Sequence, residues 1–186
     1  SIGGPTCTIK TVNMLTGIPI NHVVEINFTG FKKIVDSVGG IEVCIKNPIN
    51  DPNSNLKIDA GQQTVNGEVA LGLARARYTL ADGSDMARID RQHVLFEDLI
   101  QKVRQENFLT QPKKLYDVLS SSLESISTDE GLKNIPSMAS LLLQVKDVPD
   151  ENIKFVTLPY IDNNDGSTLS LDSKASKTMI KEILAD

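Results

Sequence analysis

Residues 29–45 read TGFKKIVDSVGGIEVCI, and the pattern within them is the strongest local signal for the fold class. The first ten residues put four apolar side chains on one face at helical spacing, which predicts a helix packed on a core. These four are Phe31, Ile34, Val35 and Val38. Gly39-Gly40 then permits the left-handed turn that ends a helix. The last five residues alternate apolar and polar side chains, as a half-buried strand does.

The same two patterns alternate along the rest of the chain. Helices are expected at 6–15, 66–74, 85–103, 112–124, 129–145 and 172–184. Strands are expected at 22–26, 56–58, 62–65 and 153–158, with 56–58 and 62–65 forming a hairpin and 47–55 an exposed loop. The core-facing stripe of the helix at 85–103 is expected to be Ile89, His93, Phe96, Ile100 and Val103. Alternating strands and helices predict a layered α/β architecture.

The bulk composition limits the classes of function. A chain of 186 residues with 40% hydrophobic and 23% charged residues is typical of one soluble globular domain. The net charge of -5 argues against a nucleic-acid partner, because nucleic-acid binders present a basic face. The chain has no G-x-S-x-G elbow, no Walker loop and no G-x-G-x-x-G. No stretch approaches the roughly 18 apolar residues of a membrane span.

The arginines are concentrated in one short segment, whereas the lysines are scattered. Four of the five arginines lie between Arg75 and Arg91. On a helix Arg75 and Arg77 would point apart, but in an extended chain they would project to the same side. Arg88 and Gln92 are four residues apart, so they share one face of the next helix, and Arg91 lies close to that face.

Guanidinium groups match phosphate oxygens in a two-pronged way that lysines do not, so this cluster predicts a diphosphate cage. Asp85 marks a helix start, which adds amide donors and partial positive charge. The alternative is that these arginines form solvated faces or weak ion pairs with Asp82, Asp85 and Asp90. His93 lies on the apolar face and is expected to be a core histidine rather than a base.

The two cysteines, Cys7 and Cys44, are far apart in the chain and have no zinc-ligand spacing. In a cytosolic protein they would be two free buried thiols. In an exported protein a disulfide between them would be favoured.

Several ordered motifs resemble the LytR-CpsA-Psr family. They are GIPIN at 17–21, VEINFTGF at 24–31, VDSVGGIEV at 35–43, GQQTVNGE at 61–68, ARAR at 74–77 and DMARIDRQ at 85–92. The resemblance covers about residues 1–104. Residues 105–186 carry no recognisable motif and are expected to complete the fold with further helices and a strand.

The resemblance implies a bacterial phosphotransferase on the outer face of the cytoplasmic membrane, anchored by an N-terminal helix that this chain lacks. The family moves a glycopolymer from a polyprenyl-diphosphate carrier to peptidoglycan or, in some members, to a surface protein. The implied fold is a layered α/β/α domain with a central mixed β-sheet flanked by helices, and the lipid tail lies in a hydrophobic tunnel.

The resemblance also implies roles for the arginine cluster. The catalytic residues would be Arg75, Arg77, Arg88 and Gln92. The diphosphate-binding residues would be Arg75, Arg77, Asp85, Arg88, Arg91 and Gln92. The implied cofactor is magnesium, whose aspartate ligands are expected before Ser1, so no metal ligand is expected in this chain. His93 stands where the family commonly has a second glutamine.

The start of the chain departs from the family pattern. Residues 1–186 are expected to be a single domain that lacks its N-terminal half, so its sheet would be incomplete and its missing half would be a partner. Export in turn favours a Cys7–Cys44 disulfide. Two alternatives stay open: a non-catalytic domain that binds polyprenyl phosphate or diphosphate, and a structural α/β domain whose arginines are solvated.

Overall fold

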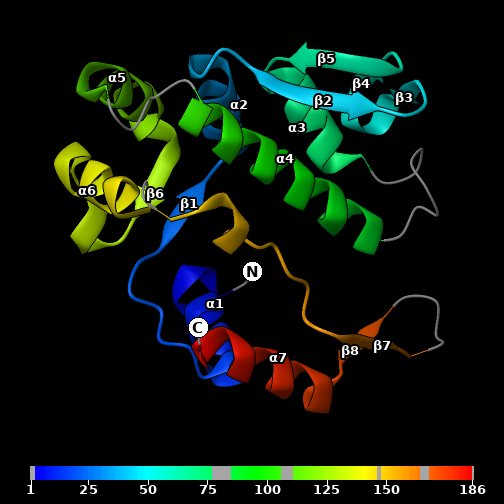
Figure 1. Ribbon diagram of the computed structural model, residues 1–186, viewed down its shortest axis with the longest axis vertical. Helices are drawn as coiled ribbons and strands as arrows, with labels where there is room; N and C mark the ends of the chain where they lie inside the picture. Colours follow the sequence, from blue (N-terminus) through cyan, green and yellow to red (C-terminus); the bar gives the residue numbers. More distant parts are fainter. Residues whose placement is uncertain (1–2, 77–84, 106–110, 146–147, 164–167, 186) are drawn as a thin grey trace. The chain divides into compact units, whose positions relative to one another are not determined.

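The computed structural model describes residues 3–76, 85–105, 111–145, 148–163 and 168–185 (Figure 1). The chain divides into two compact units. The larger unit is Val24–Val148, and the smaller unit joins Ser1–Val23 to Pro149–Asp186. All of the predicted diphosphate-binding residues belong to the larger unit.

Helices and short strands follow one another through the larger unit. Its α-helices are α2 (Phe28–Ser37), α3 (Gly67–Arg75), α4 (Asp85–Gln105), α5 (Pro112–Ser122) and α6 (Ile135–Val145). Its strands are β1 (Val24–Ile26), β2 (Ile41–Ile45), β3 (Ile49–Asp51), β4 (Leu56–Ile58), β5 (Gly61–Val65) and β6 (Ile126–Thr128). Single 3-10 turns lie at η1 (Pro52–Ser54), η3 (Leu123–Ser125) and η4 (Glu130–Leu132).

α2 forms for the local reasons that its sequence predicts. Asn27 caps it, because its Oδ1 accepts a hydrogen bond from the backbone N–H of Gly30 at 2.9 Å. Val35 is fully buried on its inner face. At the other end Gly40 has a φ of 89°, which glycine adopts without a steric cost, and its N–H donates to the carbonyl of Val35 at 2.9 Å. β2 then begins at the next residue.

The strand pairing shows that the predicted hairpin of 56–58 with 62–65 is wrong. β4 pairs with β3, and β5 pairs with β2, both antiparallel. The expected loop at 47–55 contains β3 and η1. Ile49 lies opposite Ile58, and both side chains are buried, so the β3–β4 pair hides apolar surface that the predicted hairpin would have left exposed.

The main core of the larger unit is formed by α2, α3, α4 and β2–β5. Its buried members are Val35, Ile41, Val43, Ile49, Leu56, Ile58, Val65, Ala70, Leu73, Ala76 and Leu95. From α4 this core takes Leu95, with Leu99 packed against it. The predicted core-facing stripe of α4 is therefore wrong: Phe96 is 46% exposed. Successive residues turn by roughly 100°, so the Leu95 row and the Phe96 row are adjacent faces of one helix.

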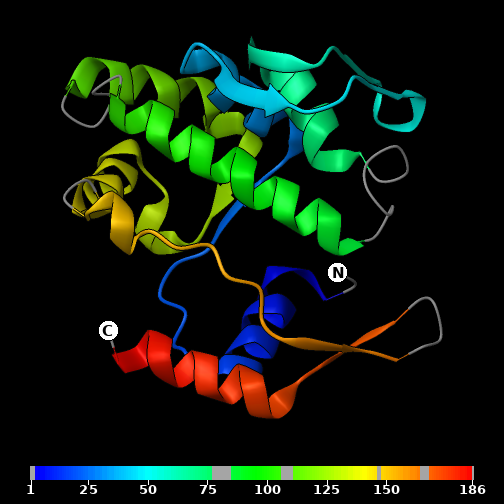
Figure 2. The ribbon, with the colours of Figure 1, turned by 45° about the vertical axis from the view of Figure 1, so that its right-hand side comes forward.

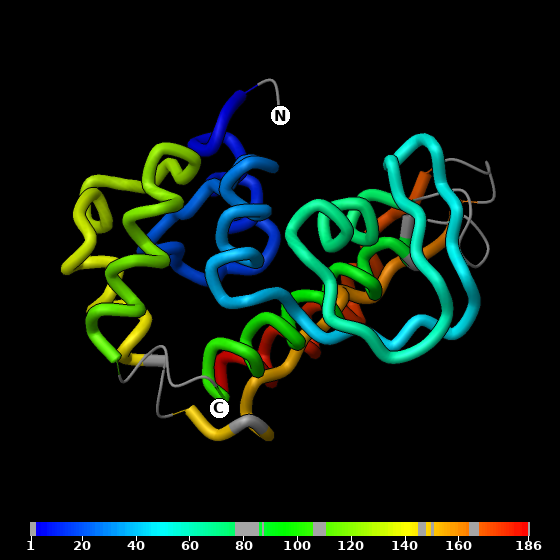
Figure 3. The backbone as a smooth tube through the Cα atoms, turned by 90° about the horizontal axis from the view of Figure 1, so that it is seen from above, coloured from blue at the N-terminus to red at the C-terminus, as the bar shows by residue number. Residues whose placement is uncertain are grey.

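α2 lies between the two halves of this unit and contacts both α3 and α5 (Figure 3). Beyond α5 a second core is formed by Leu115, Leu119, Leu132 and Met138. The predicted helix at 129–145 is two pieces, η4 and α6. The break coincides with a new helix start, because Asn134 Oδ1 accepts the N–H of Ser137 at 2.9 Å.

The smaller unit consists of α1 (Gly4–Thr16), η5 (Asp150–Asn152), β7 (Tyr160–Asp162), β8 (Leu169–Leu171) and α7 (Ser173–Ala185). Figure 2 shows the β7–β8 hairpin leading into α7. The strand predicted at 153–158 is wrong, because those residues are irregular and the strand begins at Tyr160. Tyr160 pairs with Leu171 across the hairpin, which fixes the position of the strand.

These elements confirm the α/β class. Within the described residues the strands form four two-stranded antiparallel sheets, namely β1–β6, β2–β5, β3–β4 and β7–β8. The resemblance implied a central mixed sheet that is incomplete in this chain. Among the described strands each pair is antiparallel and three to five residues long. The expectation of one domain over 1–186 stays a prediction.

Candidate functional site

Arg75 is the last residue of α3, and its side chain is exposed. The helix starts at a cap, because Asn66 Oδ1 accepts the N–H of Val69 at 3.0 Å. Ala76 has a φ of -57° and a ψ of 127°, so the chain becomes extended directly after Arg75. This is the geometry needed for Arg75 and Arg77 to project to the same side, although Arg77 itself lies outside the described residues.

The start of α3 is held tightly against α2. The N–H of Gly67 donates to Asp36 Oδ1 at 2.7 Å. A Cβ atom at Gly67 would lie 2.3 Å from the carbonyl oxygen of Lys32, so the two backbones could not approach this closely with any other residue. Lys32 Nζ and Glu68 Oε2 add an exposed ion pair at 2.8 Å. α3 is thus anchored at the end opposite to Arg75.

Two side chains of α4 hold the backbone carbonyls of the residues on either side of Arg75. Arg91 donates a hydrogen bond through Nη2 to the carbonyl of Ala76. Gln92 donates through Nε2 to the carbonyl of Ala74 at 3.1 Å. The last carbonyls of a helix have no hydrogen-bond partner inside the helix. Here α4 supplies the donors for two such carbonyls at the end of α3. Arg91 and Gln92 therefore fix the direction in which Arg75 leaves α3.

The guanidinium group of Arg75 lies over an aromatic ring. Its Cζ is 4.9 Å from the centroid of Phe28, the first residue of α2. This distance is within the range of a cation–π interaction. Sequence reasoning missed Phe28, because the two residues are far apart in the chain and the contact depends on how α2 and α3 pack.

The structure brings Arg75, Arg91 and Gln92 together where the end of α3 contacts α4. Arg88 lies one turn before Gln92 on α4 and is half-buried, with its Nε atom inside the protein. Asp85 begins α4, but its side chain lies outside the described residues, as Arg77 does. The catalytic and diphosphate-binding roles of all six residues stay predictions.

The middle of α4 carries the acidic side chains of Glu97 and Asp98, before a basic last turn. The pKa of Asp98 is raised, first by partial burial and then by the nearby negative charges of Glu97 and Glu42. α4 contacts β2, the strand that carries Glu42. A carboxylate in these surroundings would repel an anion, so the end of α4 near Arg88 and Gln92 is the part suited to phosphate.

The model described as "LytR_cpsA_psr family" matches residues 1–186. The chain belongs to the LytR-CpsA-Psr family. The match extends through residues 105–186, where the sequence alone shows no motif.

Relatives within the LytR-CpsA-Psr family include "Cell wall biosynthesis protein LcpA" of Corynebacterium glutamicum, 35% identical over 151 residues. That alignment covers 81% of this chain and 28% of the relative. "Polyisoprenyl-teichoic acid--peptidoglycan teichoic acid transferase TagU" of Enterococcus faecalis is 32% identical over 135 residues, which are 73% of this chain and 44% of the relative. The chain thus spans less than half of the length of each.

Solved structures agree with this membership. The "LytR-Csp2A-Psr enzyme from Actinomyces oris" has a TM-score of 0.76 and is 25% identical, with 97% of this chain and 70% of that chain covered. Bacillus subtilis TagV has a TM-score of 0.77 over 100% of this chain and 71% of that chain. At 23% identity the second likeness concerns the fold alone.

Magnesium is the cofactor that the LytR-CpsA-Psr resemblance implies. In the part of the chain that the structure describes, no group of three or more His, Cys, Asp or Glu side chains is placed to hold a metal ion. The described residues thus do not fit a magnesium site of their own. Likewise, none of the described helices has the length and apolar character to cross a membrane.

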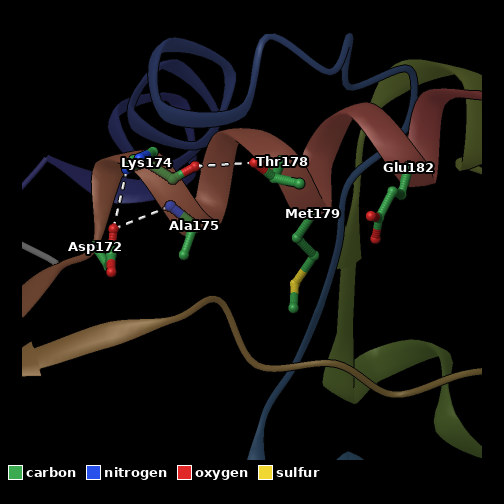
Figure 4. A pocket seen from close by; sticks show the side chains of 6 residues that line it. All are labelled: Asp172, Lys174, Ala175, Thr178, Met179 and Glu182. Carbon is green, nitrogen blue, oxygen red and sulfur yellow. Dashed lines mark hydrogen bonds between the residues drawn. The ribbon is translucent and has the colours of Figure 1, made fainter.

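Two other features lie outside the arginine site. A hollow of about 420 Å³ runs along α7 in the smaller unit, lined by Asp172, Lys174, Ala175, Thr178, Met179 and Glu182 (Figure 4). Asp172 caps α7 there by accepting the N–H groups of Lys174 and Ala175, each at 3.0 Å. Cys7 and Cys44 are both free, exposed thiols that belong to different units, so the predicted disulfide is absent from this structure.

Proposed function

We propose that this LytR-CpsA-Psr chain binds the diphosphate of a polyprenyl-linked glycan and takes part in moving the glycan onto peptidoglycan or a surface protein. The observation that carries the proposal is the placement of Arg75. Its guanidinium group is exposed at the end of α3, its flanking carbonyls are held by α4, and Phe28 lies under it. The name of the E. faecalis relative supports a polyisoprenyl-linked donor and a peptidoglycan acceptor.

A held arginine is better suited to an anion than a solvated one. A surface arginine on a free helix end loses conformational freedom when it binds a phosphate, and this loss weakens binding. Two hydrogen bonds hold the carbonyls of the residues on either side of Arg75, and the Phe28 ring limits the rotation of its side chain. In a protein with a net charge of -5, a fixed arginine also provides a local site for a negatively charged ligand. These contacts favour diphosphate binding over the solvated alternative.

An apolar row on α4 supports the lipid part of the ligand. Ile89, Phe96 and Ile100 lie along one face, with His93 between the first two, and this face starts beside Arg88. The first and last of them are separated by eleven residues, or about 16 Å of helix. These side chains are half-buried or exposed rather than part of the main core. An anionic head at the arginine end and an apolar tail along this row match the two parts of a polyprenyl diphosphate.

The proposed chemistry is phosphoryl transfer driven by positioning and charge neutralisation. The acceptor hydroxyl attacks the phosphorus that bears the sugar, and a new P–O bond forms. The P–O bond to the bridging oxygen breaks, the lipid phosphate leaves with the electron pair, and the hydroxyl proton passes to a base or to solvent. Arg75, Arg77 and Arg88 would stabilise the charge on the bridging and leaving oxygens. Gln92 would orient a phosphate oxygen.

The proposal has further parts that follow from family membership. The protein would act at the outer face of the bacterial cytoplasmic membrane, held by an N-terminal anchor. Magnesium, bound by residues of the other half of the domain, would supply further neutralisation of phosphate charge, and that half would be a partner of this chain. Export would also favour a Cys7–Cys44 disulfide. Mass spectrometry of the exported protein without reductant should find the paired peptide, and two free thiols would contradict the pairing.

The test uses the full protein that contains this chain, a radiolabelled polyprenyl-diphosphate-linked glycan, magnesium and peptidoglycan. The wild type should form labelled peptidoglycan. Arg75→Ala should lower kcat/KM by roughly 30- to 1000-fold, because losing a donor to developing negative charge costs about 2–4 kcal/mol of transition-state stabilisation.

Lys113→Ala is the matched control. It also removes one exposed cation of the larger unit, but Lys113 lies on α5, where it pairs with Asp117 four residues on. Its activity should stay near that of the wild type. Near-normal transfer by an Arg75→Ala, Arg77→Ala double variant would remove these arginines from the mechanism. Binding of the lipid without product from the wild type would instead identify a non-catalytic carrier.

A further inference from the structure

We infer that Phe28 is a positioning residue for Arg75: its ring holds the guanidinium group in place, while the N–H donors of that group would meet the diphosphate. This inference rests on the proposed function, because it concerns how the same site holds its ligand. The direct observation is the stacked pair itself, with Arg75 Cζ 4.9 Å from the ring centroid.

The ring has little other use in the fold. Phe28 is 59% exposed, so it removes only a minor part of its apolar surface from water. It is also not a member of either hydrophobic core. A large aromatic residue kept mostly in solvent at a helix start contributes little to stability through burial. Its interaction with Arg75 is the specific contact that the structure gives it.

The backbone beneath Phe28 is rigidly placed. The preceding residue, Asn27, caps α2 through its side chain, and its own N–H donates to the carbonyl of Ser125 at 3.1 Å. The residue before that, Ile26, pairs with Ile126 in the β1–β6 sheet. Gly30 is so close to η3 that an added Cβ would lie 2.8 Å from the same Ser125 carbonyl oxygen. The ring therefore projects from a fixed point.

The packing of α2 on α3 explains why Phe28 and Arg75 meet. The helices are joined at one end by the hydrogen bond from Gly67 to Asp36. Phe28 lies eight residues before Asp36, and Arg75 lies eight residues after Gly67. Gly67 also packs against the backbone of Lys32, and Arg75 lies about 12 Å further along α3, where its guanidinium group reaches the ring at the start of α2. The contact is thus built into the helix pair.

Stacking suits a phosphate ligand because of the shape of guanidinium. The group has five N–H donors, and the attraction between its positive charge and the face of the ring uses none of them. The donors are therefore left for phosphate oxygens while the ring restricts rotation of the side chain. A stacked arginine keeps the geometry for two-pronged phosphate binding without losing as much freedom when the ligand arrives.

The test compares Phe28→Leu with Phe28→Tyr in the full protein, using the dissociation constant of geranyl diphosphate and the kcat/KM of glycan transfer. Phe28→Leu should raise the dissociation constant and lower kcat/KM, each by about 3- to 10-fold. This matches the strength of a cation–π contact that is exposed to partly desolvated. Phe28→Tyr should stay within about twofold of the wild type, because a ring is retained. Tyr116→Leu, a similarly exposed aromatic residue on α5, should leave both constants unchanged.

The decisive arm repeats Phe28→Leu in an Arg75→Ala background. If the ring acts through Arg75, the second substitution should have no further effect on binding. The positioning role would be overturned if Phe28→Leu weakened binding as much in the Arg75→Ala background as in the wild type. It would also be overturned if Phe28→Tyr bound as weakly as Phe28→Leu. Unchanged constants for Phe28→Leu, measured beside an active wild type, would also overturn the positioning role. That result would leave the proposed function intact. A wild type that neither binds geranyl diphosphate nor transfers glycan would overturn the proposed function itself.

Discussion

The close approach of α2 and α3 at Gly67 yields a sharp prediction for Gly67→Ala. The new Cβ would lie 2.3 Å from the carbonyl oxygen of Lys32 and 2.6 Å from its Cα, whereas ordinary contacts begin at 3.4 Å. The neighbours are backbone atoms, so they cannot rotate away as a side chain could. Relief of the clash requires the helices to separate by about 1 Å, the difference between 3.4 and 2.3 Å.

The free-energy cost has two parts. Overpacking costs about 1–3 kcal/mol. Separation of the helices also lengthens the hydrogen bond between the N–H of Gly67 and Asp36 Oδ1, and such bonds to charged groups are worth about 1.5–3 kcal/mol. Alanine returns up to about 1 kcal/mol through its better helix propensity. The middle values of the two costs, less this gain, give an expected net loss of about 3 kcal/mol in the free energy of unfolding.

Gly72→Ala is the control, because Gly72 lies in the same helix. There the nearest atoms are side-chain atoms of Leu56 at 3.2 Å, which can move by a few tenths of an ångström. The gain in helix propensity should nearly cancel that squeeze, so the change should stay within about 1 kcal/mol.

Urea unfolding of the full protein, followed by circular dichroism, measures both variants. Gly67→Ala should lower the midpoint by about 1–2 M, given a slope of about 2 kcal/mol/M, while Gly72→Ala should not. Geranyl diphosphate should also bind Gly67→Ala more weakly, because the shifted α3 carries Arg75 away from Phe28. Equal midpoints for the two variants would refute the claim that this contact holds the helix pair.

Two further predictions concern the cap of α3 and the charge on α4. Asn66→Ala should lower the free energy of unfolding by about 1 kcal/mol, because the N–H of Val69 loses its acceptor, while Asn66→Asp should stay near the wild type in the same urea titration. The raised pKa of Asp98 means that the folded state disfavours its charged form, so stability from this group is full below pH 4 and is lost as the pH rises through the raised pKa. Asp98→Asn should therefore unfold at a slightly higher temperature than the wild type at pH 7 in calorimetry. The difference should vanish near pH 3. A difference that grows toward acid pH would contradict the predicted direction of the pH dependence.

The local sequence determines where several helices and strands begin or end. The caps at Asn27 and Asn66, and the glycine turn at Gly40, involve atoms within five residues of one another. Hydrogen bonds over such short distances depend mainly on the local sequence, which is why the positions of α2, α3 and the start of β2 could be predicted. The arginine cluster was equally visible, since its members are close in the chain.

The pairing of elements depended on the tertiary structure. Periodicity places an apolar face on α4, but two adjacent rows satisfy it, and contact with α3 and β2 selects the row of Leu95. In the same way, the mostly polar sequence of β5 (GQQTV) does not select a partner by itself, and its five-residue register with β2 prevails over a shorter hairpin with β4.

The arrangement of the candidate site is the clearest case. Sequence analysis placed Arg75, Arg91 and Gln92 in one cluster, yet it could not show that the last two hold the carbonyls on either side of Arg75. It also gave no signal for Phe28, because a cation–π contact has no sequence period and arises only when two packed helices bring distant residues together. Local chemistry supplied the arginines, and long-range packing set the direction in which one of them points.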